Sequence, residues 1–376
     1  MHRPRSLTVV LLLLIAAHAS AQQAPAPSPA TFSTGGWGFT IGGRIKLDVI
    51  HDFDAITSTD SFDPRTIVVP DTPGSNTRIH ARETRFSLGI VGPANGRELK
   101  MFVEGDFYGS GNAFRLRHAY GQYGVLLAGQ TWSTFMDEDN IPNTIDFETA
   151  VAAPLVRQGL VRLTFPVARG ATVAFGVEES DPDVVPPTGV PGAVEKSMPD
   201  FTARLRFTRG AGHVQLSGFV GQTRYRSSTG DTDDAMIGGV LASARVRPFG
   251  RDAAYGELAY GPGLGRYRGG ISAAPDTSNN LVAIDALGLT VGYEHWWSDR
   301  WSSNAVFSPA WALDDIPITA TANTQLTYAA ANLFYWFIPN RAWVGGEYLF
   351  GRREVSDGAR AIANRIQFAV RFNIPG

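Results

Sequence analysis

Apolar and polar residues alternate one by one along many segments of this chain. Residues 44–49 read RIKLDV, so that isoleucine, leucine and valine are interleaved with arginine, lysine and aspartate. The same period of two recurs at residues 84–90, 99–106, 201–207 and 365–372. Successive side chains of a β-strand point to opposite faces. These segments therefore predict strands that have one apolar face and one polar face.

The spacing of these segments favours one closed sheet. We count about sixteen candidate strands between Gly38 and Phe372, and bacterial single-chain barrels have an even number of strands. Short connections such as PANG at residues 93–96 alternate with long ones at about 55–80, 134–157, 179–199 and 265–282. Alternation also occurs in soluble β-sandwiches, but arginines recur on the polar faces opposite small residues, and aromatic residues gather at segment ends. We therefore predict an all-β fold, a transmembrane antiparallel up-and-down β-barrel with a pore-constricting loop.

The amino-acid composition is unusual for a soluble protein. Charged residues make up 18%, below the roughly 25% of typical soluble domains, while the chain contains 41 glycines and 11% aromatic residues. The absence of cysteine excludes disulfides, thiolate metal sites and a cysteine nucleophile. Beyond the N-terminal segment, no apolar run reaches the length of about 18 residues that a membrane-spanning helix needs.

The first residues have the features of an export signal. Basic residues precede the apolar run LTVVLLLLIAA, and the small-residue site Ala19-Ser20-Ala21 follows. We expect residues 1–21 to be a signal peptide, residues 22–36 to be a flexible Pro-rich lead-in, and residues 37–376 to form the barrel. A membrane anchor is the weaker alternative, because the apolar run is too short to span a bilayer.

The polar strand faces supply candidate pore-lining residues. A cluster of guanidinium groups in a low-dielectric wall raises the local concentration of anions, and each guanidinium can bind a carboxylate with two hydrogen bonds. The candidates are Arg85, Arg115, Arg117, Arg162, Arg204, Arg206 and Arg365. The alternative is that these arginines form salt bridges with acids on neighbouring strands and merely hold the barrel in shape.

Residues 134–157 form the candidate constriction loop. This loop contains the acids Asp137, Glu138, Asp139 and Asp146, and also apolar residues such as Phe135 and Ile145. Apolar residues favour burial, so we expect the loop to fold into the pore and to set its acids against the arginines of the wall. A solvated surface loop is the alternative interpretation.

Several segments resemble a known family. Residues 42–54 (GGRIKLDVIHDFD), 104–109 (EGDFYG), 115–148 and VRQ at 156–158 resemble DcaP-like outer-membrane porins, and AGQTWSTFMD at 128–137 is the most specific match. The similarity is densest over residues 42–164. The resemblance implies a sixteen-stranded, trimeric channel with a positively lined pore for dicarboxylates and other small anions. Two features depart from the family: residues 22–36 carry no heptads of a coiled coil, and four residues follow Phe372.

These observations predict a passive porin of the bacterial outer membrane. Its expected partners are small anionic solutes, outer-membrane lipids and two further copies of the chain, with no nucleic acid. We expect no enzymatic activity, catalytic residue, cofactor or metal. An outer-membrane enzyme is disfavoured because no G-x-S-x-G motif is present. A structural scaffold held together by calcium is the other alternative, but the acidic segments at residues 51–54 and 60–63 lack a full set of ligands.

Overall fold

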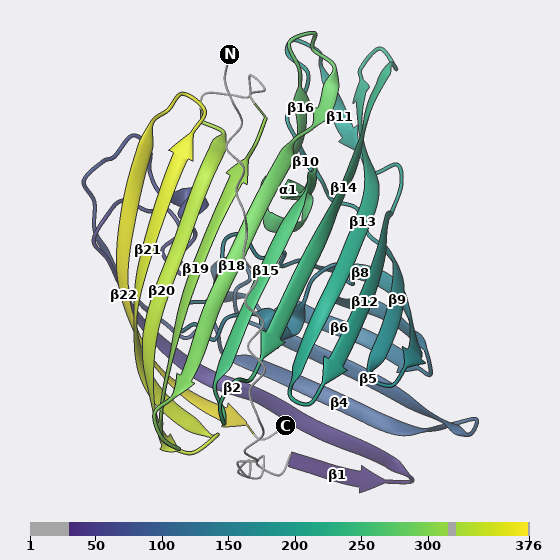
Figure 1. The fold of residues 1–376 in the computed structure, drawn as a ribbon, viewed down its shortest axis with the longest axis vertical. Helices are drawn as coiled ribbons and strands as arrows, with labels where there is room; N and C mark the ends of the chain where they lie inside the picture. The colour runs from purple at the N-terminus through teal and green to yellow at the C-terminus, as the bar shows by residue number, and fades with distance from the viewer. Residues whose placement is uncertain (1–29, 315–320, 375–376) are drawn as a thin grey trace.

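The computed structural model describes residues 30–314 and 321–374, and their strands form a barrel (Figure 1). The first half of the wall comprises β2 (Trp37–Asp52), β3 (Asn76–His80), β4 (Arg85–Ala94), β5 (Arg97–Asp106), β6 (Arg115–Tyr123), β7 (Leu126–Trp132), β8 (Arg157–Ala168) and β9 (Ala171–Glu178). The second half comprises β12 (Asp200–Arg209), β13 (Gly212–Ser227), β14 (Thr232–Val246), β15 (Ala253–Pro262), β18 (Asp285–Trp296), β19 (Trp301–Ala312), β20 (Asn323–Ile338), β21 (Ala342–Val355) and β22 (Arg360–Ile374).

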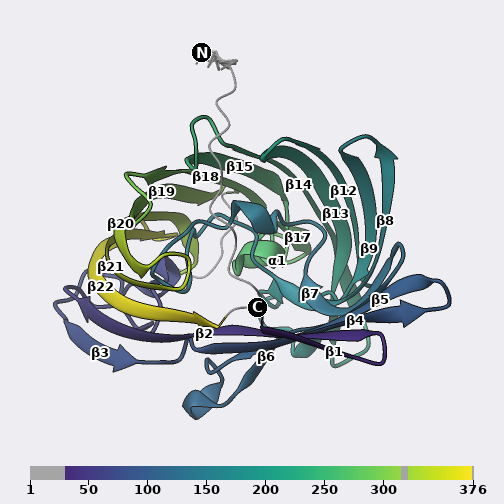
Figure 2. The same ribbon diagram turned by 90° about the horizontal axis from the view of Figure 1, so that it is seen from below.

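The wall closes because its first and last strands pair. Residues 43–52 of β2 are antiparallel to residues 365–374 of β22, and every other wall strand pairs with its neighbours in the chain. Both β3 and β4 pair with β2, so together they occupy one place in the wall. The result is a closed antiparallel barrel of 16 strands, which confirms the predicted fold class. Figure 2 shows the ring along its axis.

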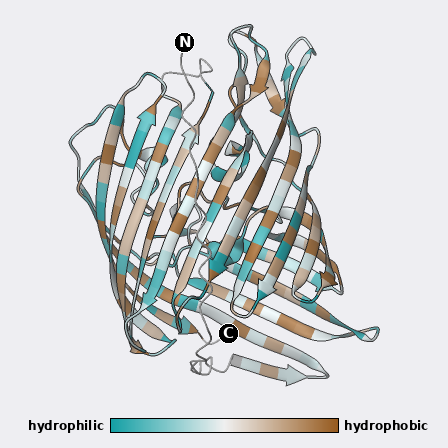
Figure 3. Cartoon of the chain, viewed as in Figure 1, coloured by the Kyte–Doolittle hydropathy of each residue, from teal (hydrophilic) through white to brown (hydrophobic). Residues whose placement is uncertain are grey.

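The two faces of the wall have opposite polarity. In β2, Lys46 and Asp48 are only 2% and 1% exposed, whereas Ile45 and Leu47 on the other face are 52% and 43% exposed. Polar residues thus point inward and apolar residues outward, which is the reverse of a soluble protein and typical of a barrel surrounded by lipid. Figure 3 shows the resulting bands of apolar and polar residues along the strands.

Connections at the two ends of the barrel differ in length. At one end, tight turns join the strands, and Asn95 and Gly96 between β4 and β5 both adopt positive φ, as a two-residue hairpin turn requires. At the other end lie the long connections at residues 53–75, 133–156, 179–199 and 263–284. This end also carries β10 (Asp183–Val184), β11 (Gly192–Glu195), α1 (Gly265–Arg268), β16 (Ile271–Pro275) and β17 (Leu281–Ala283).

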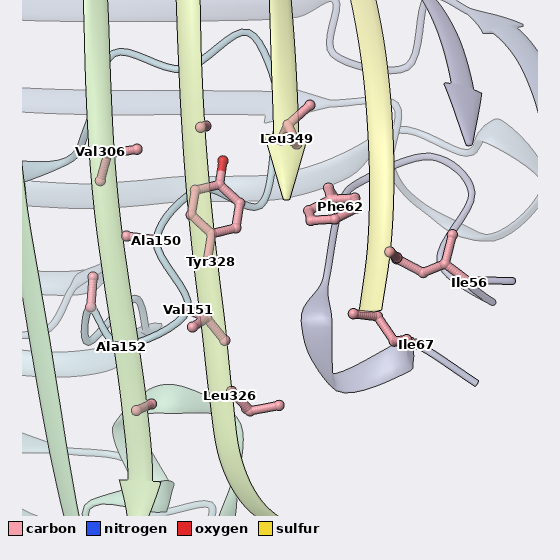
Figure 4. Close-up of a cluster of buried hydrophobic side chains, with 14 of the residues drawn as sticks. Ile56, Phe62, Ile67, Ala150, Val151, Ala152, Val306, Leu326, Tyr328 and Leu349 are labelled. Atoms are coloured by element: carbon pink, nitrogen blue, oxygen red, sulfur yellow. The ribbon is translucent and has the colours of Figure 1, made fainter. Parts of the chain in front are cut away.

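Three long connections pack inside the barrel. We name them the first loop (residues 53–75), the inner loop (residues 133–156) and the helical loop (residues 263–284, with α1). Phe62 and Ile67 of the first loop are fully buried and join residues 150–153 of the inner loop in one apolar cluster with the wall (Figure 4). In a second cluster, Phe135 of the inner loop packs with Tyr267 of the helical loop. These loops therefore pack against the side of the wall formed by β13–β15 and β18–β22.

The aromatic clusters are divided between the two faces of the wall. Trp297 and Trp301 are exposed, as expected for an interfacial girdle. In contrast, Trp336 and Trp343 point inward and are buried with Ile145 of the inner loop. Strand alternation gives consecutive aromatic residues opposite directions, so only part of each sequence cluster reaches the outer face.

The N-terminal region is described in part. Residues 30–34 form β1 (Ala30–Thr34), which pairs with the start of β2 through a hairpin. The predicted signal peptide and residues 22–29 of the lead-in lie outside the described residues. Among the residues described, no helix is long and apolar enough to cross a membrane.

Candidate pore constriction

A cavity of about 630 Å³ lies between the inner loop and the wall of the barrel. We call it the constriction cavity. The loop side contributes Glu138 and most of residues 141–149. The wall side contributes six arginines, which come from β2, β4, β6, β8 and β22: Arg44, Arg85, Arg115, Arg117, Arg157 and Arg371. The cavity thus has a basic wall and a mixed loop opposite it.

A bulge in the wall sets the direction of two side chains. The register of β5 against β6 shifts between Glu104 and Gly105, and such a bulge turns two consecutive residues to the same face. Arg117 and His118 consequently both point inward and are buried. His118 alternates with Phe114 and Leu116 in the sequence, which predicts a residue at the lipid edge or at the membrane interface. This prediction is wrong, since His118 lines the cavity and its Nδ1 lies 3.0 Å from Thr131 Oγ1.

Four of the six arginines have carboxylate partners. Arg117 bonds Glu104 at 2.9 Å and Asp106 at 2.8 Å, Arg115 also bonds Asp106 at 2.8 Å, and a separate ion pair joins Arg85 to Glu104 at 3.4 Å. On β2, the guanidinium of Arg44 bonds Glu83 at 2.5 Å. These pairs favour the alternative in which wall arginines hold the barrel in shape through salt bridges, because they connect neighbouring segments of the wall.

The other two arginines face aromatic rings. The guanidinium of Arg157 lies 4.4 Å from the ring centre of Trp132, and that of Arg371 lies 4.9 Å from that of Trp343. Within the described parts of the chain, neither has a carboxylate oxygen within 4 Å. Stacking on a ring holds a guanidinium in place without neutralising its charge. Arg157 and Arg371 therefore keep hydrogen-bond donors and a net charge available in the lumen.

The remaining predicted arginines lie at three different places. Arg162 on β8 and Arg204 on β12 point inward on either side of β9, opposite Gly176 and Ala174, and no ion pair involves them in the part of the chain that is described. Arg206 bonds Asp137 at 3.2 Å and also pairs with Asp139. Arg365 is fully buried and bonds Asp52 at 2.6 Å. Arg365 thus supports the wall and does not line the constriction cavity.

Asp137 fastens the inner loop to the wall. Its carboxylate accepts hydrogen bonds from Ser243 at 2.7 Å and Arg206 at 3.2 Å, and it lies 2.6 Å from His213 Nε2. Burial alone would raise the pKa of Asp137, but these donors outweigh it, and the pKa is lowered from its ordinary value of 3.8. Asp137 is 3% exposed, so it anchors the loop and does not form part of the open pore surface.

The lowered pKa predicts how pH acts on this anchor. Because docking lowers the pKa of Asp137, its carboxylate stabilises the docked loop at pH values above the ordinary pKa of 3.8. This stabilisation is lost as the pH falls through the lowered pKa. We expect Asp137→Asn channels to show increased current noise at pH 7, whereas wild-type channels stay quiet down to about pH 4. Equal noise in both proteins at pH 7 would remove Asp137 as an anchor.

Asp146 is a second anchor of the inner loop. Its carboxylate accepts hydrogen bonds from the backbone N–H groups of Phe62 at 2.8 Å and Glu148 at 3.0 Å, and Arg365 Nη1 lies 3.5 Å away. Burial raises the pKa of Asp146, and Arg365 and the backbone donors oppose the rise only in part. Although Asp146 borders the cavity, its oxygens are directed at backbone donors of the loops and at Arg365 of β22.

Glu138 and Asp139 are the exposed acids of the inner loop. Both belong to a 3-10 turn, Glu138–Asn140, whose last residue donates hydrogen bonds to the carbonyls of Ala244 and Gly256. Glu138 lines the constriction cavity, while Asp139 pairs with Arg206. Of the four loop acids predicted from the sequence, Glu138 is therefore the one that faces the cavity with no ion pair in the described residues.

Arg65 joins all three inward-folded loops. Its Nε bonds Asp63 in the first loop at 2.8 Å, its Nη2 bonds Glu148 in the inner loop at 2.5 Å, and its Nη1 donates to the carbonyl of Arg268 in the helical loop at 2.5 Å. The sequence gives no indication of this role for Arg65, because its partners are up to 204 residues away. Arg44 and Arg371 lie on the polar faces of alternating segments, so the sequence predicts that they point inward. Arg157 lies at the boundary between the inner loop and β8, where alternation does not predict its direction.

Within residues 30–314 and 321–374, no group of three or more histidines and acids could hold a metal ion.

Comparison with known proteins agrees with this architecture. Residues 31–374 match the model of the DcaP outer membrane protein family. A comparison with curated proteins finds no match. The outer-membrane channel DcaP of Acinetobacter baumannii has a similar structure, with 22% sequence identity, a TM-score of 0.81, and coverage of 91% of this chain and 98% of that chain.

Two further solved structures share the fold at lower similarity. An anion-selective porin from Comamonas acidovorans has 11% identity and a TM-score of 0.61, over 90% of this chain and 99% of that chain. The outer membrane protein OmpT of Vibrio cholerae has 12% identity and a TM-score of 0.56, over 92% and 99% of the two chains. The family match covers nearly the whole described barrel. The chain therefore belongs to the DcaP outer membrane protein family, and it is a porin-type β-barrel of the bacterial outer membrane.

Proposed function

We propose that the chain allows passive, selective diffusion of small anionic solutes, such as dicarboxylates, through its arginine-lined constriction. Selection in such a channel depends on pore width and on the charge of the lining. No catalytic group, cofactor or metal takes part in this function.

The observation that carries the proposal is an imbalance in hydrogen-bond capacity around the lumen. Four inward-facing arginines, Arg157, Arg162, Arg204 and Arg371, have no carboxylate within 4 Å among the described residues. The acids that border the constriction cavity are instead bonded to protein donors, with the exception of Glu138. Cationic donors thus remain available to a solute, while anionic groups are largely neutralised.

Dicarboxylate selectivity is the finer part of the proposal. It rests on the family and on the planar guanidinium fork, which binds a carboxylate with two parallel hydrogen bonds. A fold shared with an anion-selective porin also supports it. Two guanidinium groups separated across the cavity could hold the two ends of one solute.

We also propose that residues 1–21 direct export and that three copies assemble in the membrane. OmpT of Vibrio cholerae, which shares the fold, is known in a trimer form. The exposed apolar faces of the strands near the N terminus, including Leu47 and Leu88, are suited to contact between barrels.

The reversal potential of the purified, refolded protein in a planar bilayer tests the function. Under a potassium chloride gradient we expect anion selectivity, and succinate added to one side should reduce the current in a concentration-dependent manner. Cation selectivity, or absence of conductance, would contradict the proposed function. The same sample in mild detergent should migrate as a species of three chains before heating, and migration as a single chain would contradict the trimer.

A further inference from the structure

A second, smaller cavity lies at the long-loop end of the barrel. Its volume is about 60 Å³, and it lies between the helical loop and the ends of β18, β19 and β20. Arg65 and Val151 close its side toward the other inward-folded loops. Since Arg65 bonds Glu148, which borders the constriction cavity, one ion pair links the linings of the two cavities.

Arg268 gives this small cavity its charge. In the described chain, its guanidinium has no carboxylate within 4 Å, and its only hydrogen bond is a long one of 3.5 Å to the carbonyl of Leu287. Its Nε is buried without any partner. Burial and the nearby Arg65 lower the pKa of Arg268 to about 10, so the group is still cationic at neutral pH. A buried donor of this kind costs free energy unless an acceptor reaches it.

The rest of the lining is mainly apolar. Trp311, Leu326 and Ile271 form much of it, together with Ala286 and Ala310. A water-sized group needs roughly 10–15 Å³ of such volume, so the cavity holds about four to six non-hydrogen atoms. These are the size and polarity of a monocarboxylate with two to four carbons in total, the carboxyl carbon included.

We infer that this cavity is a second ligand site, which binds a small monocarboxylate with its charged group on Arg268 and its short apolar body against Trp311 and Leu326. The site is separate from the constriction, and the solute is smaller than a dicarboxylate that would bridge two arginines. The site would capture solutes ahead of the constriction, and this role rests on the proposed function. Binding itself does not depend on conductance.

Ligand-observed saturation-transfer NMR on the refolded protein in detergent tests the inference. Butyrate should bind saturably, whereas butyramide, which has the same shape without the charge, should not bind. Acetate should bind more weakly because it lacks the apolar body. The Arg268→Gln variant should weaken butyrate binding at least tenfold, and Arg360→Gln, which alters an exposed arginine of β22, should leave it unchanged.

Two further variants keep the test decisive. Ala312→Leu enlarges a side chain of the cavity lining and retains Arg268, so it should also abolish butyrate binding. An Arg157→Gln/Arg371→Gln double variant alters only the constriction and should retain it. Loss of binding in the double variant with retention in Arg268→Gln would overturn the inference, as would absence of saturable binding to the wild type. The reversal potential of the same wild-type sample reports separately on the proposed porin function.

Discussion

Replacing Arg157 and Arg371 together by glutamine should reduce anion selectivity about tenfold or more. Both guanidinium groups line the constriction cavity, and each stacks on an aromatic ring without a carboxylate partner in the described residues. A unit charge about 7 Å from a permeating anion contributes roughly 0.6–1.2 kcal/mol at effective dielectric constants of about 80 to 40, or about three- to sevenfold in partitioning. The anion-to-cation permeability ratio from reversal potentials measures the effect.

A matched control separates local from overall charge. Arg360 is exposed at the long-loop end of β22, and Arg352 of β21 lines the same pocket as Arg360 and not the constriction cavity. Arg360→Gln together with Arg352→Gln therefore removes the same total charge away from the constriction. This pair should leave the permeability ratio nearly unchanged. If both double variants lower selectivity equally, the net charge of the protein and not the lining of the constriction sets the preference.

Replacing Arg65 by methionine should produce channels with larger and more variable conductance. Arg65 connects the first loop, the inner loop and the helical loop through Asp63, Glu148 and the carbonyl of Arg268. Hydrogen bonds to charged groups contribute roughly 1.5–3 kcal/mol each, and the side chains of Arg65 and Glu148 are only partly exposed at 21% and 30%. The docked loops should therefore lose about 2 kcal/mol or more, and single-channel recordings should show frequent changes of level.

Glu148 makes this prediction more specific. Once Arg65 is removed, Glu148 borders the constriction cavity without its partner, so anion selectivity should also fall. The Arg65→Met/Glu148→Gln variant should regain selectivity but remain noisy, because the charge is removed and the connection between loops is still missing. Quiet currents in Arg65→Met would show that the apolar packing around Phe62 and Ala150, with the anchors Asp137 and Asp146, holds the loops without Arg65.

The amino-acid sequence was sufficient to predict the wall of the barrel. Strand alternation depends on local side-chain order, and this order is visible in segments such as residues 44–49 and 201–207. The lengths of the connections likewise predicted which end carries the loops. The apolar residues Phe135 and Ile145 predicted that residues 134–157 pack inside, because such residues gain free energy on leaving water.

The functions of single charged residues were not predictable in the same way. Asp137 and Glu138 are adjacent in the sequence, yet the first anchors the loop to Ser243 and the second borders the constriction cavity. Their difference depends on contacts with strands more than 70 residues away. The bulge of β6 at Arg117, opposite Glu104 and Gly105, turns His118 inward and likewise arises from the register between two strands.

By itself, then, the sequence determined that this chain forms a sixteen-stranded barrel with a polar interior, since hydrophobic burial and the two-residue period act on local patterns. Only the tertiary structure decided which charges remain available to a solute. Arg117 and Arg157 look alike in the sequence, but Arg117 is held between Glu104 and Asp106 while Arg157 lies over Trp132. Ion pairing depends on distances of a few ångströms between distant segments, and these distances exist only once the barrel has closed and the loops have folded into it.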